Sequence, residues 1–210
     1  MRKRGLVTDD ELRELVETRR VSGLADLPAE GLVEGAIRVR PHREADLPVL
    51  ARWLNDEELL VEAGFPERER DETYLREMIG GDFAEHVRTG TAAVLAIADG
   101  AADACIGQLM LFHFELDALQ AELGFWVAPE SRGRGAASSA ARVLTRWALT
   151  AGGLRRIEAR AATDNDASLR ALEGAGFVRE GVRRSDSHPR RGRPDMVLFS
   201  VISEDLDAGG

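Results

Sequence analysis

The segment that decides the fold of this 210-residue chain is Glu122-Leu-Gly-Phe-Trp-Val-Ala-Pro-Glu-Ser-Arg-Gly-Arg-Gly-Ala-Ala137. It predicts a short apolar strand that stops at Pro129, an arginine-glycine turn, and an amphipathic helix over about 134–149. The first backbone N–H groups of a helix have no intrahelical partners, and the helix dipole favours negative charge beside them. The turn is therefore an expected anion site, and its expected occupant is a phosphate or pyrophosphate.

Other uses of this turn are weaker or remain open. A Walker P-loop needs Lys-Ser or Lys-Thr after its last glycine, where this chain has Ala136-Ala137. A dinucleotide fingerprint needs a third glycine, where this chain has Ser138. A glycine-rich loop that only reverses the chain, and a module that holds ATP in the same turn, are the alternatives.

Four motifs, taken in order, resemble one family. Arg132–Ala137 resembles the R/Q-x-x-G-x-G/A signature of the GNAT acetyltransferase superfamily, whose turn and helix start hold the pyrophosphate of acetyl-coenzyme A. Asn165–Gly181 is similar to the N-x-x-S-x-x-x-L-x-x-x-GF-x-x-EG stretch of its RimJ/RimL-type branch. The segments Ile37–Leu47 and Ile106–Leu111 resemble the first strand and helix and the third strand of that branch. The resemblance spans roughly 36–202.

This resemblance implies an α/β GNAT fold, with a mixed, mostly antiparallel sheet flanked by helices. The fourth and fifth strands of that fold splay apart, and the cofactor enters the opening. We expect an N-terminal extension over 1–35, the acetyltransferase domain over 36–204 and a tail over 205–210. The extension contains a predicted helix, Thr8–Arg20, and a polar linker. It is either a loosely packed helix or tail, or a lid or homodimer contact.

Composition limits the remaining classes. The chain is long enough for one sizeable core, and 44% of its residues are hydrophobic. No apolar run is long enough for a membrane span. Cys105 is the single cysteine, which excludes an internal disulfide and favours a reducing, cytoplasmic location. The net charge of -9 argues against nucleic-acid binding. The four histidines lack metal-ligand spacing, so we expect no metal.

The expected chemistry is transfer of acetyl from a thioester to a primary amine, which must lose a proton. Deprotonating a lysine side chain at neutral pH costs about 3–4 kcal/mol more than deprotonating an α-amine, so a single carboxylate acting through water suffices for the latter. Glu122 matches the family's general-base position at the start of the strand. Substrate positioning and an exposed strand edge are its alternatives, and Glu115 and Asp117 are weaker candidates for the base.

A second part of the chemistry is the proton for the departing thiolate. Many relatives place a tyrosine five residues before the phenylalanine of the Gly-Phe pair, but here that position is Leu172. Ser168, one helical turn earlier, is the expected replacement, unless the thiolate leaves unassisted. Asn165 is the expected N-cap of the helix that contains Ser168 and Leu172, and it is also an expected cofactor contact.

The resemblance also assigns binding residues. The backbone of Phe125, Trp126 and Val127 is expected to pair with the pantetheine arm, with the Trp126 ring in the core. The other expected cofactor contacts are Arg132, Gly133, Arg134, Gly135, Ala136, Ala137, Asn165 and Ser168. The expected acceptor site contains Glu122, His113 and Arg184, the last in an arginine-rich loop over 183–193.

Together these features predict an acetyl-coenzyme A-dependent N-acetyltransferase that works by direct attack in a ternary complex. Its acceptor is a protein N-terminus or a small amine. A catalytically silent acyl-coenzyme A sensor and a transferase of a longer acyl group are the alternative functions.

Overall fold

The computed structural model describes residues 27–63, 70–80, 93–115 and 117–206. Its centre is an eight-stranded sheet in the order β1-β2-β3-β4-β5-β6-β8-β7. Neighbouring strands are antiparallel, except that β5 and β6 are parallel. The strands are β1 Leu32–Glu34, β2 Ile37–Pro41, β3 Ala93–Asp99, β4 Cys105–Glu115, β5 Gln120–Val127, β6 Arg156–Ala162, β7 Val178–Arg183 and β8 Met196–Ile202.

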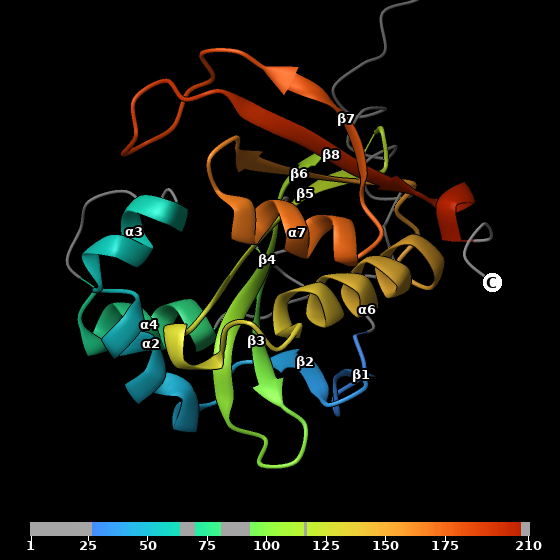
Figure 1. Cartoon of the computed structure of the whole chain (residues 1–210). Helices are drawn as coiled ribbons and strands as arrows, with labels where there is room; N and C mark the ends of the chain where they lie inside the picture. The colour runs from blue at the N-terminus through green and yellow to red at the C-terminus, as the bar shows by residue number, and fades with distance from the viewer. Residues whose placement is uncertain (1–26, 64–69, 81–92, 116, 207–210) are drawn as a thin grey trace, which may run out of the picture.

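Helices cover the sheet in two groups (Figure 1). The helices are α2 Leu47–Trp53, α3 Glu57–Ala63, α4 Glu72–Gly80, α6 Ala136–Thr150 and α7 Asp166–Gly174, with short 3-10 turns at η2 Glu44–Asp46, η3 Pro129–Ser131 and η4 Ser203–Leu206. The larger core lies between the sheet and the apolar faces of α6 and α7. A smaller core joins α2, α3 and α4 to Trp126 of β5.

The alternation of β5 explains why it serves both cores. Side chains of successive residues in a strand point to opposite faces, so Ala121, Leu123 and Val127 share one face and belong to the α6 core. Trp126 lies on the other face, as does Glu122, and is only 3% exposed in the smaller core. The ring of Trp126 therefore packs in the core, as the sequence predicts.

The sheet forks between its two parallel strands. The pairing of β5 with β6 covers only Gln120↔Arg156, Ala121↔Ile157 and Glu122↔Glu158. Both strands continue beyond these pairs, to Val127 and Ala162 respectively. The splay expected between the fourth and fifth strands of the fold is thus confirmed between the strands labelled β5 and β6. Glu122 occupies the last paired position before it.

Most predicted elements are present, with three differences. Helix α3 was not predicted, because Glu57–Ala63 is too short for a helical period to stand out. Strand β1 lies inside the predicted linker, where it pairs with β2. The sequence indicates a helical region over about 70–88, broken by Gly80-Gly81; α4 lies within it and ends at Gly80, and the remainder lies outside the described residues. The predicted helix over 8–20 also lies outside them, so the domain boundaries stay predictions. None of the described helices is long and apolar enough to span a membrane.

Candidate active site

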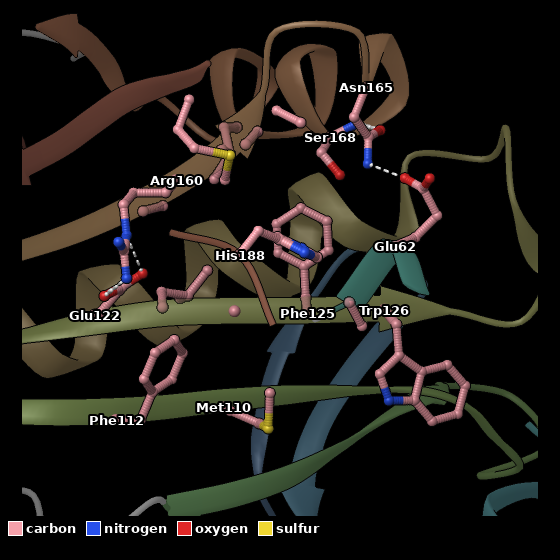
Figure 2. Close-up of a pocket in the computed structure, with 18 of the residues that line it drawn as sticks. Glu62, Met110, Phe112, Glu122, Phe125, Trp126, Arg160, Asn165, Ser168 and His188 are labelled. Atoms are coloured by element: carbon pink, nitrogen blue, oxygen red, sulfur yellow. Dashed lines mark hydrogen bonds and ion pairs between the residues drawn. The ribbon is translucent and has the colours of Figure 1, made fainter. Parts of the chain in front are cut away.

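Two adjoining cavities open at the fork in the sheet, with volumes of about 460 Å³ and about 330 Å³. The larger one, here called the turn cavity, runs from β5 to the arginine-glycine turn and the start of α6. The smaller one, the fork cavity, extends from β5 to β6 and the β7–β8 loop. Residues that line both cavities come from α3, β5 and the start of α7: Glu62, Ala63, Phe125, Trp126, Asn165 and Ser168 (Figure 2).

The far end of the turn cavity has the properties of an anion site. Gly135 is the N-cap of α6 with a left-handed φ of 76°, and no side chain caps the helix. Gly133 also has a left-handed φ, 75°, and a Cβ on either glycine would meet no heavy atom within 4 Å. Arg132 holds the turn, because its Nε donates a hydrogen bond to the Val127 carbonyl oxygen at 2.9 Å. The first N–H groups of α6 therefore face open space without a side-chain acceptor.

The middle of the turn cavity is bordered by β5 after it has parted from β6. Phe125, Trp126 and Val127 all line this cavity. Beyond Glu122 these residues have no β6 partner, so this side of the β5 backbone is left for another extended group.

The start of α7 contributes an ordered polar cluster. The Asn165 side-chain oxygen accepts a hydrogen bond from the Ser168 backbone N–H at 3.0 Å, which makes Asn165 the N-cap that the sequence predicts. Its amide nitrogen donates to Glu62 of α3 at 2.8 Å (Figure 2). The Ser168 hydroxyl lines both cavities, and it has no hydrogen-bond partner among the described residues. Leu172, at the family's tyrosine position, is buried in the wall of the fork cavity.

Glu122 lies in the fork cavity within a charged cluster that was not predicted. The Arg160 guanidinium of β6 donates two hydrogen bonds to it, Nε to Oε1 at 2.9 Å and Nη2 to Oε2 at 3.0 Å. His113 Nδ1 lies 3.0 Å from the same Oε2. The hydrogen bonds with Glu122 raise the pKa of Arg160, which keeps the guanidinium charged. The Glu122 side chain is 14% exposed, so most of its surface is already in contact.

The β7–β8 loop closes the fork cavity with His188. The backbone N–H groups of Arg190 and Arg191 both donate to His188 Nδ1, at 3.3 and 3.0 Å. Nδ1 is thus an acceptor, and the proton of the neutral ring lies on Nε2. Burial lowers the pKa of His188, and the charge of Arg191 lowers it further. Ion pairs from Arg190 to Glu57 of α3 and from Arg191 to Asp164 hold the loop over the cavity.

The predicted site residues are thus mostly, but not all, gathered here. Arg134 and Arg184 are exposed and line neither cavity. Sequence reasoning did not select Glu62, Arg160 or His188. Arg160 could have been predicted from the sequence, since period-two alternation places it on one face of β6 with Glu158. Glu62 and His188 carry no local signal, because they reach the cavity only through tertiary packing of α3 and of a loop.

Comparison with known proteins agrees with this architecture. Residues 36–178 match the family model described as Acetyltransferase (GNAT) domain, and the chain belongs to this family. The Bacillus subtilis protein named "Putative ribosomal N-acetyltransferase YdaF" is 29% identical over 101 residues, which are 48% of this chain and 55% of that protein. The chain thus spans about half the length of the curated relatives it matches.

Solved structures share the fold. Mycobacterium smegmatis RimJ in complex with CoA-disulfide has a TM-score of 0.67 at 24% identity, over 86% of this chain and 92% of that one. Spermidine N-acetyltransferase from Vibrio cholerae, in complex with CoA and spermine, has a TM-score of 0.68 at 19% identity, over 82% and 98%. Both matches show that the chain shares the fold of these solved structures.

Proposed function

We propose that this chain is an N-acetyltransferase that moves acetyl from acetyl-coenzyme A to a primary amine by direct attack in a ternary complex. The observation that carries the proposal is the fork in the sheet. It joins an unpaired β5 edge, an uncapped helix N-terminus and a carboxylate, Glu122, in two connected cavities. Membership of the GNAT family supports the same assignment.

The residues of the turn cavity fit coenzyme A. The space beside Gly133 and Gly135 suits a pyrophosphate, which the first N–H groups of α6 and the remaining Arg132 N–H groups would bind. The unpaired backbone at Phe125–Val127 suits the amides of the pantetheine arm, which would add to β5 as an extra strand. When bound, acetyl-coenzyme A supplies the activated acyl group, and the protein supplies orientation and proton transfer.

In this proposal the carboxylate of Glu122 promotes loss of a proton from the attacking amine, and Ser168 donates a hydrogen bond to the leaving sulfur. The Ser168 hydroxyl is suited to this role because it faces both cavities and lacks a partner among the described residues. The acceptor enters the fork cavity, whose carboxylates Glu62 and Glu122 attract an amine. The acceptor is a protein N-terminus or a small amine. A cytoplasmic location remains a prediction.

Calorimetric titration with acetyl-coenzyme A tests the cofactor site first. We expect wild-type protein to bind at micromolar concentration, and the double variant Arg132→Ala, Gly135→Glu to lose binding. Gly35→Glu is the matched control, because Gly35 also has a left-handed φ, 59°, with open space around it, and it lines neither cavity. Loss of binding in this control as well would assign the effect to misfolding.

An amine panel then tests turnover, followed by release of free thiol. Turnover with at least one amine is the expected result. Binding without thiol release for any amine would instead identify an acyl-coenzyme A sensor, which the leucine at position 172 makes conceivable. Competition by ATP for the same site would identify a nucleotide-binding module. Faster turnover with longer acyl donors would correct the identity of the transferred group.

A further inference from the structure

We propose that His113 is the general base of the transfer, and that Glu122 acts through His113 rather than through water. The inference rests on the proposed function and deepens it. It begins with the state of the Glu122 carboxylate, whose two oxygens already accept hydrogen bonds from Arg160. Protonating Glu122 would weaken this charge-assisted pair, so the carboxylate is better suited to orient another group than to take a proton.

His113 lies in the position of the group that the Glu122 carboxylate orients. An ionised carboxylate only accepts hydrogen bonds, so His113 Nδ1 donates its proton to Glu122 Oε2 across the 3.0 Å separation. The neutral imidazole then has its lone pair on Nε2. Nε2 has no hydrogen-bond partner among the described residues, and the side chain of His113 is 69% exposed. His113 therefore has the arrangement of a base, with one nitrogen oriented by a carboxylate and the other accessible.

The backbone at His113 is shaped to aim this ring. His113 has a left-handed φ of 50°, a conformation that non-glycine residues rarely adopt. The residue lies in an irregularity of β4, where the register with β5 shifts between Phe112 and Glu115. Such bulges turn a side chain away from its regular direction and occur beside active sites. The Phe112 ring meets the His113 ring edge-on with centroids 4.8 Å apart, which further limits its orientation.

His113 also lies where the proton is released. It lines the fork cavity together with Glu122, Phe125 and Ser168. As the amine nitrogen bonds to the acyl carbon, an N–H proton passes to His113 Nε2 and the ring becomes imidazolium. The C–S bond breaks, the thiolate leaves with the electron pair, and it takes up one proton. The imidazolium is stabilised by the adjacent Glu122 and returns its proton to solvent.

Several charged side chains surround His113. A further cavity of about 300 Å³ shares Glu122 and Arg160 with the fork cavity, and His113 lines both. The ionisable groups that line this further cavity with His113 are Glu115, Glu122, Glu158, Arg160, Glu180 and Arg183. Asp186 lies behind Arg160 at 3.2 Å. The negative charge of the four glutamates attracts a cation at this place, and the two arginines repel it.

The test is His113→Gly, which suits the left-handed backbone and leaves room for added imidazole. We expect kcat/KM for the amine to fall about 100-fold or more, with unchanged affinity for acetyl-coenzyme A. Added imidazole should restore about tenfold. The acid limb of the pH profile, where kcat/KM rises with pH, should disappear in His113→Gly. With substituted imidazoles it should return at the pKa of the added base.

Controls separate the outcomes. Ser185→Gly removes a side chain at a similar left-handed φ, 54°, outside both cavities. Its kcat/KM should equal that of the wild type and should not change when imidazole is added. Two acceptors with amines of different pKa distinguish an enzyme limb, which stays constant, from a substrate limb, which moves. A raised KM for the amine with an intact acid limb in His113→Gly would overturn the proposal and leave His113 a binding residue. No thiol release by the wild-type protein would instead refute the proposed function.

Discussion

Removing the buried cation Arg40 should destabilise the protein strongly. Its guanidinium on β2 donates to both oxygens of Asp46, at 2.8 and 3.0 Å, and the two side chains are only 2% and 3% exposed. This pair ties the start of α2 to the sheet. In Arg40→Leu the Asp46 carboxylate would stay buried without a cation, which costs about 3–5 kcal/mol. For a chain of this length that lowers the melting temperature by roughly 6–20 °C.

The structure also predicts an asymmetry within the pair. Asp46→Asn should cost less, about 1–3 kcal/mol, because Arg40 keeps a second carboxylate, Asp103, 2.8 Å from its Nε. Arg43→Leu is the exposed control. Arg43 also pairs with Asp103, but its side chain is 52% exposed, so its loss should cost under about 1 kcal/mol.

The pH dependence checks the electrostatic origin of the effect. Burial would raise the pKa of Asp46, but the adjacent His42, 3.4 Å away, and hydrogen bonds from Arg40 and the Arg43 backbone outweigh it and lower the pKa. The stability this group contributes is therefore complete above the unfolded pKa, near 3.9, and is lost as the pH falls toward the folded pKa. In Arg40→Leu the folded pKa of Asp46 should instead be raised, so acid stabilises the variant relative to wild type.

Thermal and urea unfolding at pH 7 and pH 4 measure both effects. The gap between wild type and Arg40→Leu should narrow at pH 4. A gap below about 1 kcal/mol at pH 7 would refute the reasoning, because it would mean that Asp46 loses little without its cation. A large gap that does not change with pH would assign the loss to packing alone.

The Arg40–Asp46 pair also bears on metal binding. Ligand atoms of His42, Asp46 and Cys105 lie within 4.8 Å of one another, but a cation there would compete with Arg40.

Two further predictions concern other parts of the chain. Burial raises the pKa of the Cys105 thiol to about 11, so about 0.1% is thiolate at pH 8. Iodoacetamide should modify Cys105 only after unfolding, and rapid labelling of the folded chain, followed by mass spectrometry, would contradict its burial. Asn165→Ala should cost about 1 kcal/mol by removing the α7 cap, whereas Asn165→Ser should keep most of that stability, because its hydroxyl can cap the helix without placing a second carboxylate beside Glu62. Equal losses in thermal unfolding would show that the cap is not the stabilising contact.

The arginine-glycine turn and the helix after it were predictable because their causes are local. Gly133 and Gly135 allow a left-handed turn, Pro129 ends the strand, and the apolar period of 136–150 defines a helix. The N-cap role of Asn165 follows in the same way from residues three apart. Each of these patterns depends on neighbours within one or two turns of chain, so no tertiary information is needed to recognise them.

Only part of the surroundings of Glu122 was predicted: His113 was expected in the same acceptor site, whereas Arg160 was not. Its partners His113 and Arg160 are 9 and 38 residues away, and only the pairing of β5 with both β4 and β6 brings them to one carboxylate. The left-handed backbone of His113 arises from a register shift between two strands, for which a histidine carries no signal.

The sequence by itself determined the arginine-glycine turn and the helix after it, because these depend on short-range periodicity and on glycine and proline geometry, and its motifs indicated the family and most of the elements. Only the tertiary structure brought together the groups of the proposed proton-transfer site. Strand register and the packing of a distant helix and loop bring Glu62, His113, Arg160 and His188 together around the fork. Those contacts depend on long-range packing, which local sequence patterns do not encode.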